Sequence, residues 1–541
     1  MIAGPDPFAV EAGAKVLATG GNAIDAAVTC AFAQGVVNPA NTGIGGYSLL
    51  IYQPATNGNQ PSPVVCLDAP ATAGSRVRPD MWLDRFERED ASGWGFVLRG
   101  RVNEHGYQSI CTPGLVLGLS TALERWGTIG LASAIEPAAR LAADGFAVDE
   151  RVAAHWSTRF QLSSDTSVLD YVRANPEASR LYLGADGGPQ RAGDVVRNPD
   201  YATTLRTIGA SGARDFYRGS VAARMAADLE ANGAFVTDPD LAGYAVRDLP
   251  AVVGSYRGFD IASSPAPHGG PTVLALLGIL EGWDLAAMEH NGAAYILRVA
   301  SAMAAAFEDR NDRLGDPLFV DDPGDWHSAD RAEAWRRRID AGEAVIVRTA
   351  PQSTGTTQVT VVDHTGNAAS LTHSLGGSSG VVTPGLGFMF NNSMANFDPR
   401  PGGPNSIAAG KSRSTGMAPT ILQNRDGRQL VIGASGATKI IGAVVQVILN
   451  IVDFGMTPQE AVNAPRFDCQ GGPIRCHIRI PEATCDLVRR RRPIQRLASA
   501  YGGLGLAHVV AVDARTGALH GGVDAGSSGM AMQVDALAER R

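Results

Sequence analysis

Long apolar segments are missing from this sequence, and so are the features of an export signal. No run of residues approaches the roughly 20 apolar positions that a transmembrane helix needs. The stretch from Met1 to Pro7 has neither the basic region nor the apolar core that a signal peptide carries. We therefore predict no membrane partner and a cytoplasmic location, or a periplasmic or secreted one if a further segment precedes Met1.

Charge is also sparse and nearly balanced. Charged residues make up 18% of the 541 positions, and the formal net charge is −8. The one basic block, residues 489–492, stands before Pro493 at the end of a helix-like segment, where solvent would cover it. So mild a charge gives no reason to expect nucleic acid or an anionic membrane as a partner. A hydrophobic content of 45% predicts a globular protein with a large core.

Cysteine is scarce and scattered. The six thiols lack the paired C-x-x-C spacing of zinc and redox motifs, and Cys469, Cys476 and His477 together fit no zinc pattern either. We expect buried or free thiols, and we predict neither a metal nor another cofactor. The cysteines are Cys30, Cys66, Cys111, Cys469, Cys476 and Cys485.

Hydrophobic periodicity predicts helices on both sides of a strand-rich middle. The expected helices span residues 8–19, 22–37, 115–126, 130–144, 219–232, 271–283, 293–308 and 438–453, with Asn22 as a candidate N-cap of the second. The expected strands span residues 48–53, 244–248, 259–263, 357–363, 367–373, 387–391, 429–433, 476–480, 507–512 and 518–522. This arrangement is typical of an α/β protein built as an αββα layered sandwich.

The most informative segment is residues 355–363, where Gly355 precedes two threonines and an alternating apolar strand pattern. A threonine hydroxyl is a poor nucleophile until a base removes its proton. If the chain were cut before Thr356, the new α-amine, with an ordinary pKa of about 7.7–8.0, would supply that base on the same residue. Taken alone, Thr356 and Thr357 are more simply explained as ordinary strand threonines, but the surrounding motifs reverse that interpretation.

Further motifs stand in a fixed order on both sides of Gly355. They occupy residues 20–27, 43–46, 112–114, 217–219, 240–244, 256–258, 314–317, 366–367, 374, 391–392, 414–417, 433–437 and 464–467. Each motif is weak alone, but their joint order resembles the γ-glutamyltranspeptidase family over nearly the whole chain. The resemblance implies the N-terminal-nucleophile hydrolase fold of that family.

The resemblance also implies that the chain cuts itself between Gly355 and Thr356. A large chain, 1–355, and a small catalytic chain, 356–541, would then remain together as one folded unit. The freed Thr356 would attack a small-molecule amide and pass the acyl group to water or to an amine acceptor.

Four residues of this sequence match the catalytic positions of the family. Thr356 would be the nucleophile, and Ser374 stands where the family usually has a threonine that supports the nucleophile and self-cleavage. Gly436 and Ala437 stand at paired glycines whose backbone N–H groups form the oxyanion hole. Because these donors belong to the backbone, Ala437 can serve there unless the position needs a positive φ.

The departures from the family pattern fall on the residues that bind the acyl group. The arginine that holds the γ-glutamyl α-carboxylate and a pair of serines are replaced by Cys66, Thr415 and Gly416. The aspartate, the Glu/Gln and the asparagine that hold the α-ammonium are replaced by Asn396, Ser393 and Gly376. The full charges expected to hold a zwitterionic glutamyl group are therefore missing from these positions.

A neutral Asn396 cannot make the charge-assisted bond of an aspartate with an ammonium, which is roughly twice as strong as a neutral one. Some cephalosporin acylases of the family have Asn at this position, and glutaryl is γ-glutamyl without its amino group. We therefore predict a γ-glutamyltranspeptidase-like acylase for γ-glutamyl-like or glutaryl-like amides. A true γ-glutamyltransferase or glutathione hydrolase and an inactive, uncleaved structural homologue remain the alternatives. Lys411 and Lys439 are candidate anchors for the acyl carboxylate, although solvated lysines are the simpler interpretation.

Overall fold

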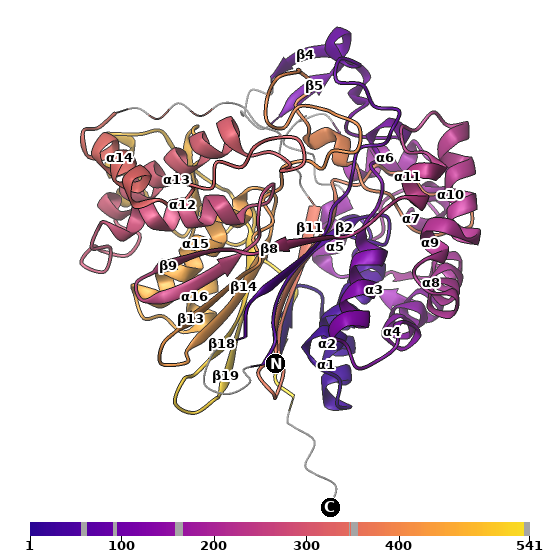
Figure 1. Ribbon diagram of the computed structural model, residues 1–541, viewed down its shortest axis with the longest axis horizontal. Coiled ribbons are helices and arrows are strands. Elements are labelled where there is room, and N and C mark those ends of the chain that lie inside the picture. Colours follow the sequence, from indigo (N-terminus) through magenta and orange to yellow (C-terminus); the bar gives the residue numbers. More distant parts are fainter. Residues whose placement is uncertain are drawn as a thin grey trace, which may run out of the picture.

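Two β-sheets face each other in the middle of the molecule, and helices cover the outer face of each (Figure 1). The structure is a computed structural model that describes residues 1–55, 62–89, 95–156, 166–343, 345, 347 and 355–534. The layers follow the order helix, sheet, sheet, helix, so the predicted α/β sandwich with αββα layers is confirmed. Both termini of the described chain lie at the same end of the sandwich (Figure 1).

Seven strands form the first sheet, and each is antiparallel to its neighbours. Their order is β20 (Met530–Met532), β1 (Ile2–Gly4), β11 (Gly355–Val362), β12 (Ala368–Gly376), β2 (Tyr47–Gln53), β3 (Val65–Ala69) and β8 (Arg247–Pro250). In this order β11 and β12 lie between β1 and β2, which come from the start of the chain. Strands from both sides of the Gly355–Thr356 bond therefore interleave in one sheet.

Six strands form the second sheet, again with antiparallel neighbours. Their order is β19 (Leu519–Val523), β18 (Leu506–Val512), β14 (Gln429–Ser435), β13 (Thr420–Asn424), β10 (Phe259–Ser263) and β9 (Val252–Tyr256). Polar side chains join the two sheets where β14 packs on β11 and β12. Gln358 Nε2 donates to Ser370 Oγ at 2.9 Å, and Ser370 Oγ donates to the carbonyl oxygen of Ile432 at 2.9 Å. The space between the central strands is therefore polar.

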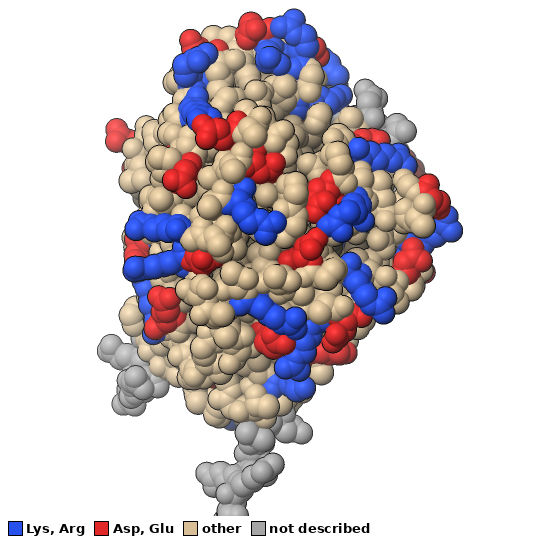
Figure 2. All heavy atoms as spheres, turned by 90° about the vertical axis from the view of Figure 1, so that its right-hand side faces the viewer, with Lys and Arg blue, Asp and Glu red and all other residues tan. Residues whose placement is uncertain are grey.

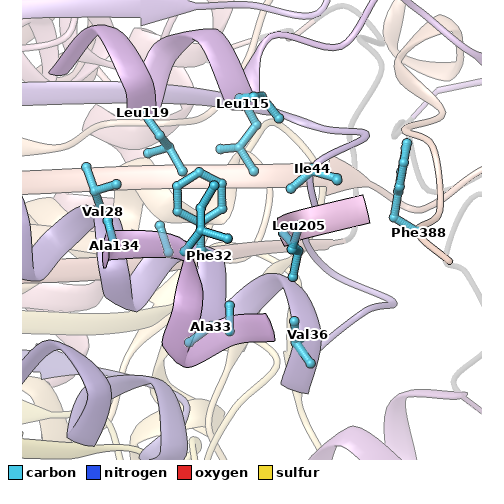
Figure 3. Packing of buried hydrophobic residues seen from close by; sticks show 14 of the residues in the cluster. Val28, Phe32, Ala33, Val36, Ile44, Leu115, Leu119, Ala134, Leu205 and Phe388 are labelled. Atoms are coloured by element: carbon cyan, nitrogen blue, oxygen red, sulfur yellow. The ribbon is translucent and has the colours of Figure 1, made fainter. Parts of the chain in front are cut away.

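Helices cover the outer face of the first sheet, and α2 lies at the centre of this layer. Asn22 caps α2 by accepting from the N–H groups of Ile24 and Asp25, and Asp25 accepts in return from the N–H of Asn22, as the predicted cap requires. Phe32 of α2 points into the hydrophobic core beside Leu119 of α3 and Ala134 of α4 (Figure 3). The main helices of this layer are α1 (Pro7–Ala18), α2 (Ala23–Val37), α3 (Leu115–Trp126), α4 (Leu131–Asp144) and α8 (Pro199–Ser211).

A second set of helices covers the other sheet. Its main members are α12 (Gly270–Glu281), α13 (Ala293–Arg313), α14 (Ala329–Asp340) and α15 (Lys439–Val452). The remaining α-helices are α5 (Glu150–Trp156), α6 (Val168–Arg173), α7 (Pro176–Tyr182), α9 (Asp215–Arg218), α10 (Ser220–Ala231), α11 (Asp238–Ala242), α16 (Pro458–Asn463) and α17 (Glu482–Arg489). The smaller strands are β4 (Phe86–Glu89), β5 (Phe96–Leu98), β6 (Phe146–Ala147), β7 (Val195–Val196), β15 (Phe467–Asp468), β16 (Ile474–Cys476) and β17 (Ile494–Arg496).

One predicted strand, residues 387–391, is wrong. Phe388 and Phe390 alternate as they would in a strand and both are buried, but Gly385 and Gly387 have φ values of 71° and 78°. These left-handed conformations turn the chain, so Phe390 forms only an isolated bridge with Gly45. Two further strands are shifted along the chain. The strand expected at 244–248 is β8, Arg247–Pro250, and the strand expected at 476–480 is β16, Ile474–Cys476. Strands β3, β9 and β13 have no counterpart among those expected.

The surface carries charges of both signs. On the face that Figure 2 shows, Lys and Arg side chains alternate with Asp and Glu side chains between larger uncharged areas. Within the described ranges, no helix combines the length and the apolar character needed to cross a bilayer. The cellular location stays a prediction.

We expect Gly433→Ala to destabilise the sandwich, because a Cβ at Gly433 would lie 2.2 Å from Cδ of Gln358. Gln358 is fully buried and held by hydrogen bonds, so relief of this overlap would push the sheets apart. We expect a loss of about 1–3 kcal/mol in the free energy of unfolding, measured by urea denaturation. Gly472→Ala is the matched control, since its Cβ would meet no atom within 4 Å. Equal stability of the two variants would contradict this account.

Candidate active site

Thr356 is the second residue of β11 and stands beside Ser374 of the neighbouring β12. Its Oγ1 lies 2.6 Å from the carbonyl oxygen of Gly355 and 3.3 Å from Oγ of Ser374. Ser374 Oγ also donates to the Gly355 oxygen, and it accepts from the N–H of Gly376 at 2.8 Å. Two hydroxyl groups therefore converge on the carbonyl oxygen of the peptide bond that precedes Thr356. This geometry brings together the predicted nucleophile, its predicted supporting hydroxyl and the predicted cleavage bond.

Gly355 sits where a side chain has no space. In the antiparallel register it pairs with Gly376, and an irregularity in the ladder between Gly355 and Thr357 turns Thr356 toward Ser374. A Cβ at Gly355 would lie 2.3 Å from the carbonyl oxygen of Gly376. The close approach of these two backbones explains the glycine before Thr356.

Gly436 and Ala437 follow the end of β14 and precede α15. Their φ values are 124° and 62°, so the position of Ala437 does require the positive φ that disfavours an L side chain. The carbonyl oxygen of Ala437 would lie 2.2 Å from a Cβ placed on Gly416. The serine that the family pattern has at Gly416 has no space here, because the Ala437 carbonyl occupies it.

Thr415 is held by a buried histidine that the sequence analysis did not identify. Thr415 Oγ1 lies 2.8 Å from Nδ1 of His268 and accepts from the N–H of Met417 at 3.1 Å. His268 Nε2 lies 3.1 Å from Oδ1 of Asp68, although the two atoms are not aligned for a hydrogen bond. The hydroxyl of Thr415 is thus tied to its own surroundings. His268 belongs to no motif recognised in the sequence, and Asp68, two residues after Cys66, carried no assigned role that would have signalled this contact.

Asn396 and Ser393 form a short 3₁₀ turn, Ser393–Asn396, next to Gly376. A Cβ on Gly376 would lie 3.9 Å from Oδ1 of Asn396. Both residues are buried, and within the described part of the chain neither amide atom of Asn396 nor Oγ of Ser393 has a hydrogen-bond partner. Buried polar groups are normally hydrogen-bonded, so these atoms are placed as a ligand site would place them.

The remaining predicted residues do not supply a positive charge to this place. Cys66 is buried between the sheets and pairs with Ile51 of β2. Ile51 lies four residues, or about 13 Å of strand, from Tyr47, which is the strand partner of Ser374. Burial raises the pKa of the Cys66 thiol, which keeps it neutral. Lys411 Nζ donates to the carbonyl oxygens of Pro404 and Ser406, and Lys439 Nζ donates to that of Gly503.

A buried arginine that the sequence analysis did not identify lies nearer to Ser374. Arg413 stands two residues before Thr415 in the loop that leads into β13, and it is 4% exposed. Its guanidinium donates to the hydroxyl oxygen of Tyr47, whose strand partner on β12 is Ser374. Its position beside the recognised 414–417 motif was the available signal.

The chain is similar to known proteins over most of its length. The sequence model of the family described as Gamma-glutamyltranspeptidase matches residues 9–534. The Acylase ACY 1 proenzyme of Pseudomonas sp. (strain V22) is 33% identical over 521 residues, which cover 93% of this chain and 88% of that protein. The chain belongs to the γ-glutamyltranspeptidase family. The Glutathione hydrolase proenzyme of Escherichia coli (strain K12) is 32% identical over 493 residues, which cover 87% of this chain and 81% of that protein.

Solved structures agree with this family assignment. The cephalosporin acylase from Bacillus halodurans is 26% identical and superimposes with a TM-score of 0.85, covering 98% of this chain and 94% of its own. The gamma-glutamyltranspeptidase of Helicobacter pylori is 32% identical with a TM-score of 0.55, covering 62% of this chain and 90% of its own. The family resemblance found in the sequence is therefore confirmed over nearly the whole chain.

We expect Ala437→Gly to stabilise this member of the γ-glutamyltranspeptidase family. The left-handed conformation costs an L residue about 1–2 kcal/mol, whereas glycine adds about 0.4–1 kcal/mol of unfolded-chain entropy. The free energy of unfolding from urea titration should therefore rise by up to about 1 kcal/mol. Ala434→Gly in the interior of β14 is the control and should lower it by about 0.5–1 kcal/mol or more. An Ala437→Gly protein that unfolds earlier than its parent would contradict strain at this position.

Proposed function

We propose that the protein is a self-processing amide hydrolase or acyltransferase in which Thr356, once freed as an N-terminal residue, attacks γ-glutamyl-like or glutaryl-like amides. The family and its relatives, named as acylase and glutathione hydrolase proenzymes, support the reaction class. The observation that carries the proposal is the pair of hydroxyls, from Thr356 and Ser374, on the carbonyl oxygen of Gly355.

Maturation begins at this carbonyl. Oγ1 of Thr356 attacks the carbonyl carbon of Gly355, and the hydroxyl of Ser374 stabilises the negative charge that develops on the oxygen. The bond from that carbon to the nitrogen of Thr356 then breaks, the nitrogen takes a proton, and an ester remains. Water hydrolyses the ester, which leaves a carboxylate on Gly355 and a free amine and hydroxyl on Thr356.

The two products, 1–355 and 356–541, stay together in this proposal because they share both sheets. The first sheet alternates between the two pieces, since β11 pairs with β1 and β12 pairs with β2. In the second sheet β13 pairs with β10. Separation of the chains would therefore expose strand edges and core at once.

Catalysis then uses groups on one residue and on one turn. The freed amine of Thr356, with an ordinary pKa of about 7.7–8.0, accepts the proton of the hydroxyl as it attacks the substrate carbonyl. The backbone N–H groups of Gly436 and Ala437 are the proposed donors to the resulting oxyanion. The acyl group leaves Thr356 when water or an amine attacks the ester.

The neutral residues beside Gly376 favour acyl groups that lack an amino group. Asn396 and Ser393 offer uncharged donors and acceptors in a buried place, so a substrate ammonium there would lose its hydration without gaining an anion. This supports a preference for glutaryl over γ-glutamyl amides, with a true γ-glutamyltransferase as the outcome if the preference is reversed.

The first test of this function is the splitting of the chain. Wild-type protein should yield two bands on a denaturing gel, and the smaller should begin Thr-Thr-Gln-Val. Thr356→Ala should remain one chain because the nucleophile is missing, and Ser374→Ala should split more slowly. Thr357→Ala is the matched control, since its hydroxyl lies near Gln34 and Asp6 on the helix side and its loss should leave splitting intact. An active enzyme that never splits would refute the mechanism.

The second test compares acyl groups. An unpaired substrate ammonium costs about 1–3 kcal/mol, so kcat/KM for glutaryl p-nitroanilide should exceed that for γ-glutamyl p-nitroanilide by roughly ten- to a hundredfold. Asn396→Asp should shift this ratio toward the γ-glutamyl substrate because the new carboxylate can pair with the ammonium. A wild-type enzyme that strongly prefers γ-glutamyl would show that other residues hold the ammonium.

A further inference from the structure

The loop before β13 buries a positive charge that no carboxylate balances. Arg413 is 4% exposed, and among the residues that the structure describes no acidic oxygen lies within ion-pairing distance of its guanidinium. Its Nη2 donates to the hydroxyl of Tyr47, its Nη1 donates to the carbonyl oxygen of Ser414 at 3.2 Å, and its Nε has no partner. Burial lowers the pKa of Arg413 to about 9, which expresses the cost of an uncompensated buried cation.

Tyr47 places this guanidinium on the catalytic side of the first sheet. Tyr47 pairs with Ser374 across β2 and β12, and side chains of paired residues project from the same face about 4.5–5.5 Å apart at Cβ. Ser374 contacts Thr356 from that face. The guanidinium carbon of Arg413 lies 4.8 Å from the centroid of the Tyr47 ring. Arg413 is therefore connected to the nucleophile through two residues, Tyr47 and Ser374.

An amide clamp joins the Arg413 loop to the unsatisfied turn at 393–396. Asn405 accepts from the N–H of Ser414 at 2.8 Å and donates to the carbonyl oxygen of Asn396 at 2.7 Å. Arg413, which precedes Ser414, is thus fixed beside Asn396 and Ser393, whose polar side-chain atoms also lack partners. Through Asn405 and Tyr47 this buried cation is linked both to the unsatisfied turn at 393–396 and to Ser374, which contacts Thr356.

We propose that Arg413 binds the free carboxylate of the acyl chain, and that the substrates are therefore amides of acyl groups that end in a carboxylate. The inference rests on the proposed function and names its substrate class more closely. The planar guanidinium offers a fork of N–H donors that matches a carboxylate, and a bound carboxylate would neutralise the buried charge. Glutaryl and γ-glutamyl groups share this terminal carboxylate, so Arg413 serves either.

The other buried or nearby cations fit this role less well. The ammonium groups of Lys411 and Lys439 already donate to backbone carbonyls. Arg310 of α13 is also buried, its Nη1 also lacks a partner, and its Nη2 donates to the carbonyl oxygen of Thr415 at 2.8 Å. It reaches the loop, however, from the helix layer of the second sheet and makes no hydrogen bond with Tyr47 or Asn405 that would place it beside Ser374 or Asn396 among the described residues. Arg310 is therefore the sharpest control, because it is a second buried arginine on the same loop.

The test compares two substrates of equal size. One is glutaryl p-nitroanilide, and the other carries a terminal carboxamide in place of the carboxylate. Arg413→Met should lower kcat/KM for the carboxylate substrate by about tenfold to a hundredfold, and change that for the carboxamide by less than about threefold. Arg413→Lys keeps the charge but loses the fork, so it should fall between Met and the wild type. Inhibition by free glutarate should weaken in the same order.

The controls separate the anchor from the enzyme as a whole. Arg310→Met should affect both substrates by the same factor, because we expect it to support the loop. The anchor would be overturned if Arg310→Met lost kcat/KM selectively on the carboxylate substrate. It would also be overturned if Arg413→Met and Arg413→Lys lost kcat/KM equally on both substrates, or lost none on either. A wild-type chain that splits and cleaves both amides equally well would overturn the anchor alone. A wild-type chain that neither splits nor cleaves would overturn the proposed function and the anchor with it.

Discussion

The register between β11 and β12 is the constraint on which the site depends. Side chains alternate between the two faces of a strand, so a shift of one residue would turn Thr356 and Ser374 away from each other. The helix-facing side chains hold the register. His373 lies 2.7 Å from Oε1 of Gln34 through its Nε2, and Gln34 Nε2 donates to the carbonyl oxygen of Gln358 at 3.2 Å. Helix α2 therefore fixes the chemistry on the opposite face of the sheet, although it contributes no group to it.

The proposed acyl site is unusual in its balance of charge. A typical buried ion is paired, and an unpaired one costs several kcal/mol. Here the cation of Arg413 is placed among neutral groups, and the aspartate that the family pattern has at Asn396 is absent. An aspartate at 396 would add a negative charge beside the proposed acyl group, which favours a substrate that carries an ammonium. The loss of a negative charge at 396 and the presence of a positive charge at 413 thus fit each other physically.

Local signals predicted the elements whose formation depends on local chemistry. The Asn22 cap and the apolar run of α2, the strand after Gly355 and the helix after Ala437 were all expected from the sequence. Phe388 and Phe390 misled because their alternation resembles a strand while the glycines beside them turn the chain. Contacts between distant segments left no such signal. The link between Arg413 and Tyr47 joins residues 366 positions apart, and that between His268 and Thr415 joins residues 147 positions apart.

Because β1, β11, β12 and β2 interleave, refolding depends on whether the Gly355–Thr356 bond is intact. While the Gly355–Thr356 bond is intact, these strands find each other within one molecule, at the modest entropic cost of closing a loop. If the bond is cut as proposed, the same pairing requires two molecules to meet, so recovery from unfolding would become a concentration-dependent reaction. Under this proposal the uncut chain would act as the folding template for its own cut form, and heat damage to the cut form would be repaired far less readily than damage to the precursor.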